Sequence, residues 1–253
     1  MYRWLVPLVL MSGVCHARVF NWTDSNFAPY VRGSAGYMNL DQDAFANSSG
    51  EGTTMAGKSN YDYGGEIGFM FGLSPKLHVR LGAEVLDAHP VNTTGMNSSG
   101  TSLFTLNSSV FVFNPNLTIE YVFKASGNVR FFAELGAGYA TIQGTNVYSM
   151  TSAGTAAYGV PNYTESMTTT TISGQAGAAM EALFTDRVTF ILDLGYRYLP
   201  VDSLKYSSAV NSIVTPSGAT KGSPVLNEDG SQRRFNLSGP YGGAAFRFYL
   251  NFL

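Results

Sequence analysis

Apolar and polar residues alternate along most of this chain. Within Tyr61–Leu73, for example, Ile67 and Phe71 fall on one face of an extended chain, and Asp62 and Glu66 fall on the other. A helix would repeat its apolar residues three and four positions apart, and that spacing is not seen here. A period of two indicates β-strands with one apolar and one polar face.

Eight segments of this kind follow one another. We expect strands at Tyr30–Leu40, Tyr61–Leu73, Leu77–Val85, Ser109–Phe123, Val129–Ala140, Thr169–Phe184, Val188–Leu199 and Phe235–Leu253. Pro115 lies inside the fourth segment, where it removes a donor from the hydrogen-bond ladder. We therefore expect a local bulge or bend at Pro115.

The breaks between these segments alternate in length. The breaks at 74–76, 124–128 and 185–187 are tight turns, whereas those at about 41–59, 87–102, 141–168 and 200–234 are long and rich in Asn, Ser, Thr and Gly. An even number of strands with short turns on one side and long loops on the other is typical of bacterial outer-membrane barrels. Closing the sheet also pairs every backbone group within lipid. We predict an all-β fold, an eight-stranded antiparallel up-and-down transmembrane β-barrel with short periplasmic turns and long extracellular loops.

A soluble barrel of the lipocalin type would show the same alternation with the opposite polarity, since it buries its apolar face. The distribution of charges and aromatic residues favours lipid on the outside. Charged residues occupy the face opposite the aromatics, Tyr gathers near the long loops and Phe gathers near the short turns. Two aromatic girdles around an apolar band are expected of a barrel in lipid.

The composition of the chain excludes some classes of function. Only 13% of residues are charged, against about 25% in soluble domains, and the formal charge is −2. The chain therefore lacks the basic surface that nucleic acid would require. The first residues resemble an export signal, with Arg3, an apolar stretch at 5–11 and a cleavage site ending at Ala17.

We accordingly divide the chain into a signal peptide (1–17), a periplasmic N-terminal segment (18–28) and the barrel (29–253). Lipidation at Cys15, the only cysteine, is the alternative to cleavage after Ala17, but bulky Val14 stands where a small residue belongs. With cleavage after Ala17 the mature chain has no thiol.

Three stretches carry a likeness to a known group, at 116–123, 131–140 and 245–253. They resemble the fourth, fifth and last strands of the small eight-stranded outer-membrane proteins of the OmpA transmembrane domain, OmpX and opacity-protein type. The resemblance implies the barrel fold, residence in the bacterial outer membrane with loops on the cell exterior, and recognition of the C-terminal strand by the barrel-assembly machinery. The last residue departs from the pattern, because it is Leu253 and the group usually ends in Phe.

The polar faces would line a lumen only just wide enough for side chains. Twelve charged residues are expected there as a network: Arg32, Asp62, Glu66, Arg80, Glu84, Glu120, Arg130, Glu134, Glu181, Asp193, Arg197 and Arg247. Buried charges must pair, so we expect a plug of salt bridges. The alternative is a gated narrow pore for ions or small solutes.

Other candidate sites lie at the outer surface. The bases Lys205, Lys221, Arg233 and Arg234 of the fourth long loop are candidates for binding lipopolysaccharide phosphates. A stripe of small residues, formed by Gly33, Ala35, Gly242 and Ala244, is a candidate protomer interface in a weak dimer, the alternative being a monomer.

The sequence gives little evidence of a catalytic site. Asp87 and His89 share a face near the outer rim, but no nucleophile motif accompanies them, and His78 is expected to point into the lumen. We expect no enzyme, no cofactor and no metal. Asp41, Asp43 and Asn47 lack the spacing of a calcium loop.

The expected function is a structural or surface-contact, adhesin-like role through the four long loops, with outer-membrane lipid and a surface ligand as partners. Loops on a rigid scaffold are where binding usually resides. A narrow pore is the alternative, and a lipid-modifying enzyme is a distant third.

Overall fold

The computed structural model describes residues 26–41 and 58–250, whose regular secondary structure is almost entirely β. The long strands are β1 (Phe27–Asp41), β2 (Lys58–Gly72), β3 (Leu77–Met96), β4 (Ser102–Ser126), β5 (Val129–Met150), β6 (Tyr163–Thr185), β7 (Val188–Tyr198) and β11 (Gly239–Phe248). One short helix, α1 (Ser152–Tyr158), joins β5 to β6, and β8 (Pro200–Val201), β9 (Lys205–Tyr206) and β10 (Phe235–Asn236) lie between β7 and β11.

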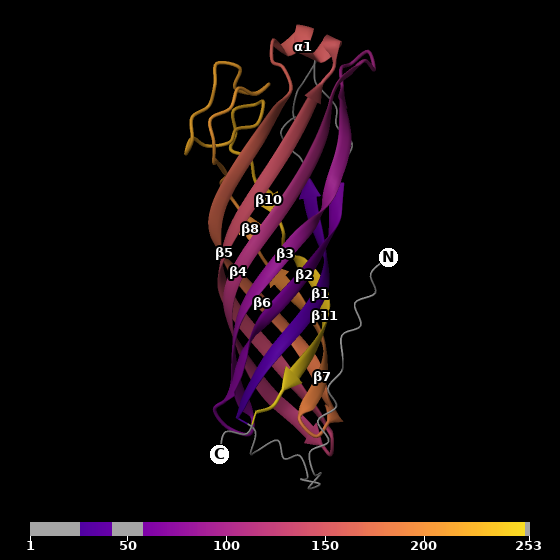
Figure 1. The fold of residues 1–253 in the computed structure, drawn as a ribbon, viewed down its shortest axis with the longest axis vertical. Helices are drawn as coiled ribbons and strands as arrows, with labels where there is room; N and C mark the ends of the chain where they lie inside the picture. Colours follow the sequence, from indigo (N-terminus) through magenta and orange to yellow (C-terminus); the bar gives the residue numbers. More distant parts are fainter. Residues whose placement is uncertain (1–25, 42–57, 251–253) are drawn as a thin grey trace, which may run out of the picture.

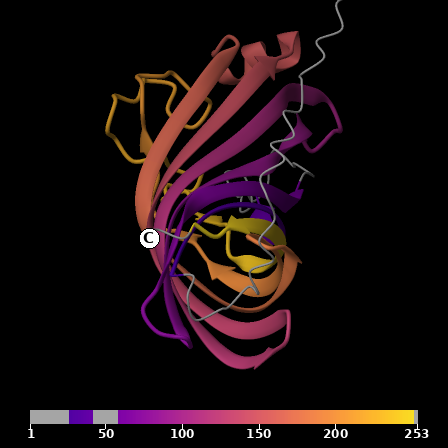
Figure 2. The same cartoon turned by 60° about the horizontal axis from the view of Figure 1, so that its bottom comes forward.

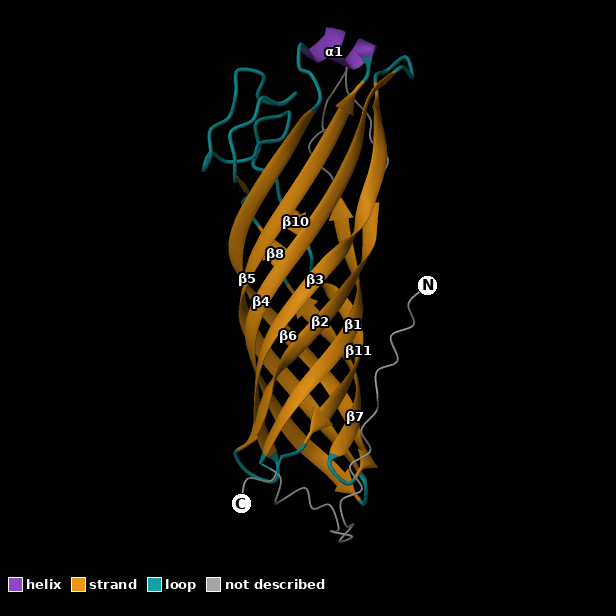
Figure 3. Cartoon of the chain, in the orientation of Figure 1, coloured by secondary structure: helices purple, strands orange, loops and turns teal. Residues whose placement is uncertain are grey.

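The eight long strands form a closed antiparallel ring. Each pairs with its neighbours in chain order, and β11 pairs with both β7 and β1, so that Gly33 lies opposite Ala244 at the closing seam. Figures 1 and 3 show the tilted strands running the length of the molecule. The predicted eight-stranded antiparallel barrel is confirmed.

The lower part of the barrel carries its apolar side chains on the outside. Ile67, Leu135 and Leu194 are each about two thirds or more exposed, and the girdle tyrosines Tyr61 and Tyr139 are more than half exposed. Charged side chains on the same strands point inward and are buried. This polarity is that of a barrel surrounded by lipid and is opposite to that of a lipocalin.

The strands of one wall continue well beyond the tyrosine girdle. The wall made by β3, β4, β5 and β6 rises above the rest of the ring in Figure 2 and ends in the turn at 97–101 and in α1. The prediction of long loops at 87–102 and 141–168 is therefore wrong. Those stretches were assigned to loops because they are polar, yet they keep the alternation of a strand.

Above the girdle the polarity of the strands reverses. On β5, Glu134 points inward and Leu135 outward, whereas further along Ile142 and Tyr148 are buried and Gln143 is exposed. The inner face becomes apolar and the outer face polar, as expected of a sheet that has water outside and a packed core inside. The barrel thus has a lipid-facing half and a water-facing half.

The expected bulge at Pro115 is not present. Pro115 pairs with Ala83 of β3 in an unbroken register, and the register with β5 is the same on both sides of it. The pairs with β5 at Asn114 and Pro115 are simply missing, so the absent N–H breaks the ladder locally without adding a residue. The shift occurs instead between Ala88 and Val91, where Pro90 lies.

Several sequence expectations concern residues outside the described part of the chain. They are the signal peptide (1–17), most of the periplasmic segment (18–28), most of the first long loop with Asp43 and Asn47, and the end at Leu253. β1 begins at Phe27, two residues before the expected start of the barrel. Within the described residues, no helix is both long and apolar enough to cross a membrane.

We predict that Leu135→Arg destabilises the barrel in phospholipid vesicles by about 2–4 kcal/mol, because it places a charge at the middle of the lipid-facing band. The matched control is Val147→Arg, on the outer face of the same strand above the girdle, where water solvates the charge. Urea titration of the refolded proteins measures both free energies of unfolding. Equal losses for the two variants would mean that the band does not face lipid.

Candidate functional site

The lumen of the lipid-facing half is filled by charged side chains. All twelve residues predicted for the charge network are buried, and they comprise seven carboxylates and five guanidiniums. They come from all eight long strands, with at least one charged residue on each. The sequence prediction had to place them by face alone, and the structure brings them into direct contact.

Arg32 and Arg80 occupy the middle of the network. Arg32 binds Asp193 through two hydrogen bonds of 2.6 and 3.0 Å and lies 3.4 Å from Glu66. Arg80 contacts Glu120 at 3.0 Å and Glu134 at 3.4 Å. Each guanidinium therefore joins carboxylates from two other strands of the barrel.

Two further groups extend this arrangement toward the ends of the lumen. On the extracellular side, Arg197 binds Glu84 at 3.0 Å and Asp62 at 3.3 Å. On the periplasmic side, Glu181 accepts hydrogen bonds from Arg130 at 2.7 Å and from Arg247 at 3.1 Å, and Arg247 also pairs with Glu120. The network therefore crosses the barrel at several levels along its axis.

Uncharged side chains complete the packing of the lumen. Tyr30 donates a hydrogen bond to Glu66, and Tyr241 donates one to Glu134. The Glu66 carboxylate and the Tyr30 hydroxyl approach Gly82 closely, so a Cβ there would force these two groups to move. The space left by this inward glycine is therefore taken by side chains of the network.

The extracellular half of the interior holds an apolar plug. We use this name for the buried residues that the segment 199–237 contributes to the core between the strands: Leu199, Val201, Leu204, Tyr206, Val225, Phe235 and Leu237. They pack against inward residues of the wall, among them Met38, Leu86, Val110 and Ile142. The long loop predicted at about 200–234 is present between β7 and β11, and its apolar residues are buried inside the mouth of the barrel.

A buried ion pair fastens the plug segment to the wall. Arg233 binds Glu165 of β6 at 2.9 Å, and both side chains are fully buried. Asn146 donates a second hydrogen bond to Glu165 at 3.3 Å, and Arg233 also donates to the carbonyl of Leu226 at 3.2 Å. Burial opposes the charge of Arg233, but the Glu165 carboxylate raises its pKa above the usual range.

Arg233 therefore cannot serve as a surface base, and its assignment to lipopolysaccharide binding is wrong. The sequence shows two adjacent arginines, and only the structure separates them into a buried Arg233 and an exposed Arg234. Glu165 and the apolar plug were also missed. One signal was available, since Glu165 is the only charged residue between Leu135 and Met180.

The tip of the projecting wall has a small core of its own. Leu103, Phe104, Leu106 and Tyr148 are buried together, and Ile213 of the plug segment packs against them. Tyr163 stacks on Tyr148 at a centroid distance of 4.5 Å. Burial raises the pKa of the Tyr148 hydroxyl, and the Glu165 carboxylate raises it further. These tyrosines stiffen the tip.

The remaining candidate residues lie on the outer surface. Lys205, Lys221 and Arg234 are exposed, as are Asp87 and His89 on β3. The four small residues of the closing seam face outward in two directly opposed pairs, with Gly33 opposite Ala244 and Ala35 opposite Gly242. Their role as a protomer interface stays a prediction. No group of metal-ligating side chains occurs within the described residues.

We predict that Arg233→Ala weakens the attachment of the plug segment by about 3–5 kcal/mol, because it leaves Glu165 buried without its counter-charge. Trypsin should then cleave at Lys205 and Lys221 in the folded barrel. Arg234→Ala is the matched control, expected to change stability by less than about 0.5 kcal/mol. Glu165→Gln in the Arg233→Ala background should restore part of the lost stability. Cleavage of Arg233→Ala at the wild-type rate would contradict the assignment.

The chain is similar to known proteins only at the level of solved structures. No family model and no curated protein matches it. Among solved structures it is similar to the outer membrane protein OprG of Pseudomonas aeruginosa (12% identity, covering 90% of this chain and 99% of that one, TM-score 0.45). It is also similar to Ail, the attachment invasion locus protein of Yersinia pestis (12%, 88% and 99%, TM-score 0.39). The outer membrane protease OmpT of Escherichia coli is a more distant match (8%, 89% and 96%, TM-score 0.36). At these identities the likeness concerns the fold alone and transfers no activity.

Proposed function

We propose that this protein is a non-conducting outer-membrane barrel whose projecting wall serves as a contact surface at the cell exterior. The observation that carries this proposal is the double closure of the interior. The charge network fills the lumen at the level of the lipid-facing band, and the apolar plug fills the mouth above it. The two seals lie in series along the axis.

A narrow pore is less well supported by this geometry. Ions crossing the barrel would have to displace both the paired charges and the packed apolar core, and an eight-stranded barrel has no spare width around them. The same filled interior makes the barrel a rigid support. Rigid support favours binding, because the surface needs little ordering when a partner arrives.

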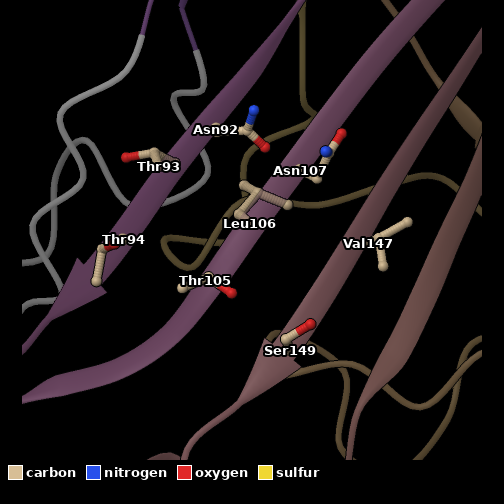
Figure 4. A pocket seen from close by; sticks show the side chains of 8 residues that line it. All are labelled: Asn92, Thr93, Thr94, Thr105, Leu106, Asn107, Val147 and Ser149. Carbon is tan, nitrogen blue, oxygen red and sulfur yellow. The ribbon is translucent and has the colours of Figure 1, made fainter.

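The outer face of the projecting wall has a distinct composition. No Asp, Glu, Lys or Arg occurs between Ala88 and Ile119, and the only one between Leu135 and Met180 is the buried Glu165. The exposed side chains there are mainly Asn, Thr, Ser and Gln. A pocket of about 350 Å³ lies on β3, β4 and β5. It is lined by the side chains labelled in Figure 4, namely Asn92, Thr93, Thr94, Thr105, Leu106, Asn107, Val147 and Ser149.

Such a surface suits an uncharged, hydroxyl-rich partner. It offers both donors and acceptors and no electrostatic field to steer charged molecules. We infer that the wall contacts neutral polysaccharide at the cell surface. An enzymatic role has weaker support, since Asp87 and His89 lie on the outer face of β3 beside the bulge at Pro90, away from this pocket.

The refolded mature protein is expected to give no discrete openings in planar bilayers. Glu66→Gln and Arg80→Ala should also stay silent, since each leaves the apolar plug in place. A variant in which residues 203–234 are replaced by a short linker should remain silent through the charge network alone. Folding is verified by the shift of the heated sample on gels. Discrete wild-type openings would overturn the proposal and favour the narrow pore.

Cells that display the protein are expected to adhere to wells coated with dextran, a neutral polysaccharide. Adherence should change little when salt is raised about tenfold, because charges do not contribute. Asn107→Glu combined with Ser149→Glu should reduce adherence by placing two charges on the exposed face of the wall. Ser126→Glu, at a short turn on the other side of the membrane, is the control. Unchanged adherence of the double variant, or a marked fall with salt, would contradict the proposed contact surface.

A further inference from the structure

A second pocket opens on the outer face of the barrel, where the plug segment meets the edge of β6. Its volume is about 540 Å³. It is lined by Thr168, Thr169, Thr170, Ser203, Lys205, Tyr206, Ser207, Lys221 and Gly222. Hydroxyl groups and two lysines thus dominate the lining, and no carboxylate side chain belongs to it.

Backbone pairing builds this pocket. β9 adds to the edge of β6, with Lys205 opposite Thr168, and the Ser207 amide donates to the Ser166 carbonyl at 2.8 Å. The turn at 220–223 is anchored in the same place, since the Gly222 amide donates to the Tyr206 carbonyl at 2.8 Å. Gly222 has φ +88°, which a side chain would strain, so the tight turn that presents Lys221 depends on glycine.

The two lysines supply unneutralised positive charge. Both are exposed, and neither has an ion-pair partner among residues 26–41 and 58–250. The other basic residues of the plug segment do not line the pocket, because Arg233 is buried with Glu165 and Arg234 lies elsewhere. Ammonium groups with hydroxyl donors form a suitable site for a phosphate and for the sugar that carries it.

The height of the pocket matches the surface of the membrane. The hydroxyl of the girdle residue Tyr139 donates to Thr170 of the pocket at 2.9 Å. Ile172, 70% exposed, lies just below on the lipid-facing band. Thr168 precedes Ile172 by four residues on β6. In a tilted strand this places Thr168 about 10 Å closer to the extracellular end of the barrel than Ile172. An acyl chain against Ile172 would therefore place its headgroup beside Lys205 and Lys221.

We propose that this pocket holds the phosphorylated sugar headgroup of a glycolipid in the outer leaflet of the membrane. Lys205 and Lys221 bind its phosphate, the threonine and serine hydroxyls contact the sugar, and the acyl chains lie on Ile172 and the girdle. The inference rests on the proposed outer-membrane location but not on the proposed contact surface of the wall.

The test uses the full mature chain refolded into phosphatidylcholine vesicles that contain diphosphoryl lipid A or its dephosphorylated form. Native mass spectrometry after detergent extraction counts the lipid retained on the folded protein. We expect wild type to retain diphosphoryl lipid A. Lys205→Ala with Lys221→Ala should bind it about 20- to 30-fold more weakly, as two lysine–headgroup contacts are lost. Lys205→Arg with Lys221→Arg should keep the binding.

The matched control removes two exposed lysines from the opposite rim. Lys76→Ala with Lys124→Ala should retain lipid A as wild type does. Equal retention by the Lys205 and Lys221 alanine variant, or equal retention of dephosphorylated lipid, would overturn the proposal. Displacement of lipid A by equimolar inorganic phosphate would overturn the lipid as ligand. Failure of wild type to insert into the vesicles would instead refute the proposed membrane location.

Discussion

Every charge that points into this barrel must be neutralised by another side chain, and the rest of the structure depends on that requirement. The closed sheet is in lipid on the outside and only a few side chains wide on the inside, so water cannot solvate the interior charges. Arg32, Arg80 and Arg197 neutralise the inward carboxylates by contacting them from several strands. The contacts that neutralise the charges also close the lumen and join strands of the barrel.

The reversal of polarity at the tyrosine girdle explains the upper half of the molecule. Once the strands leave lipid, the outer face must be hydrated, and the apolar residues on the same strands turn to the interior. Strands this long would leave the apolar mouth of the barrel open to water if no other segment filled it. Leu204, Val225 and Phe235 of the plug segment fill it, and the buried pair of Arg233 with Glu165 fixes the segment in place.

Because the lumen of this barrel is filled, its function depends on the outer surface. Two surfaces with different chemistry lie above the lipid-facing band. The projecting wall is uncharged and carries Asn, Thr and Ser, whereas the edge of β6 presents Lys205 and Lys221 among hydroxyls at membrane level. The first suits neutral partners outside the cell, and the second suits phosphorylated lipid within the membrane.

The eight strands, their antiparallel order and the inward charges follow from the alternation of polarity along the chain, because a period of two is a local property that lipid enforces on both faces. The sequence could not show that the polar stretches beyond Ala88 and Ala140 continue as strands, since their reversed polarity resembles that of loops. The folded chain alone shows which arginine binds which carboxylate, that Arg233 is buried while Arg234 is exposed, and that apolar residues of the fourth loop fill the mouth. These outcomes depend on contacts between residues far apart in the chain, and local patterns of polarity carry no information about such contacts.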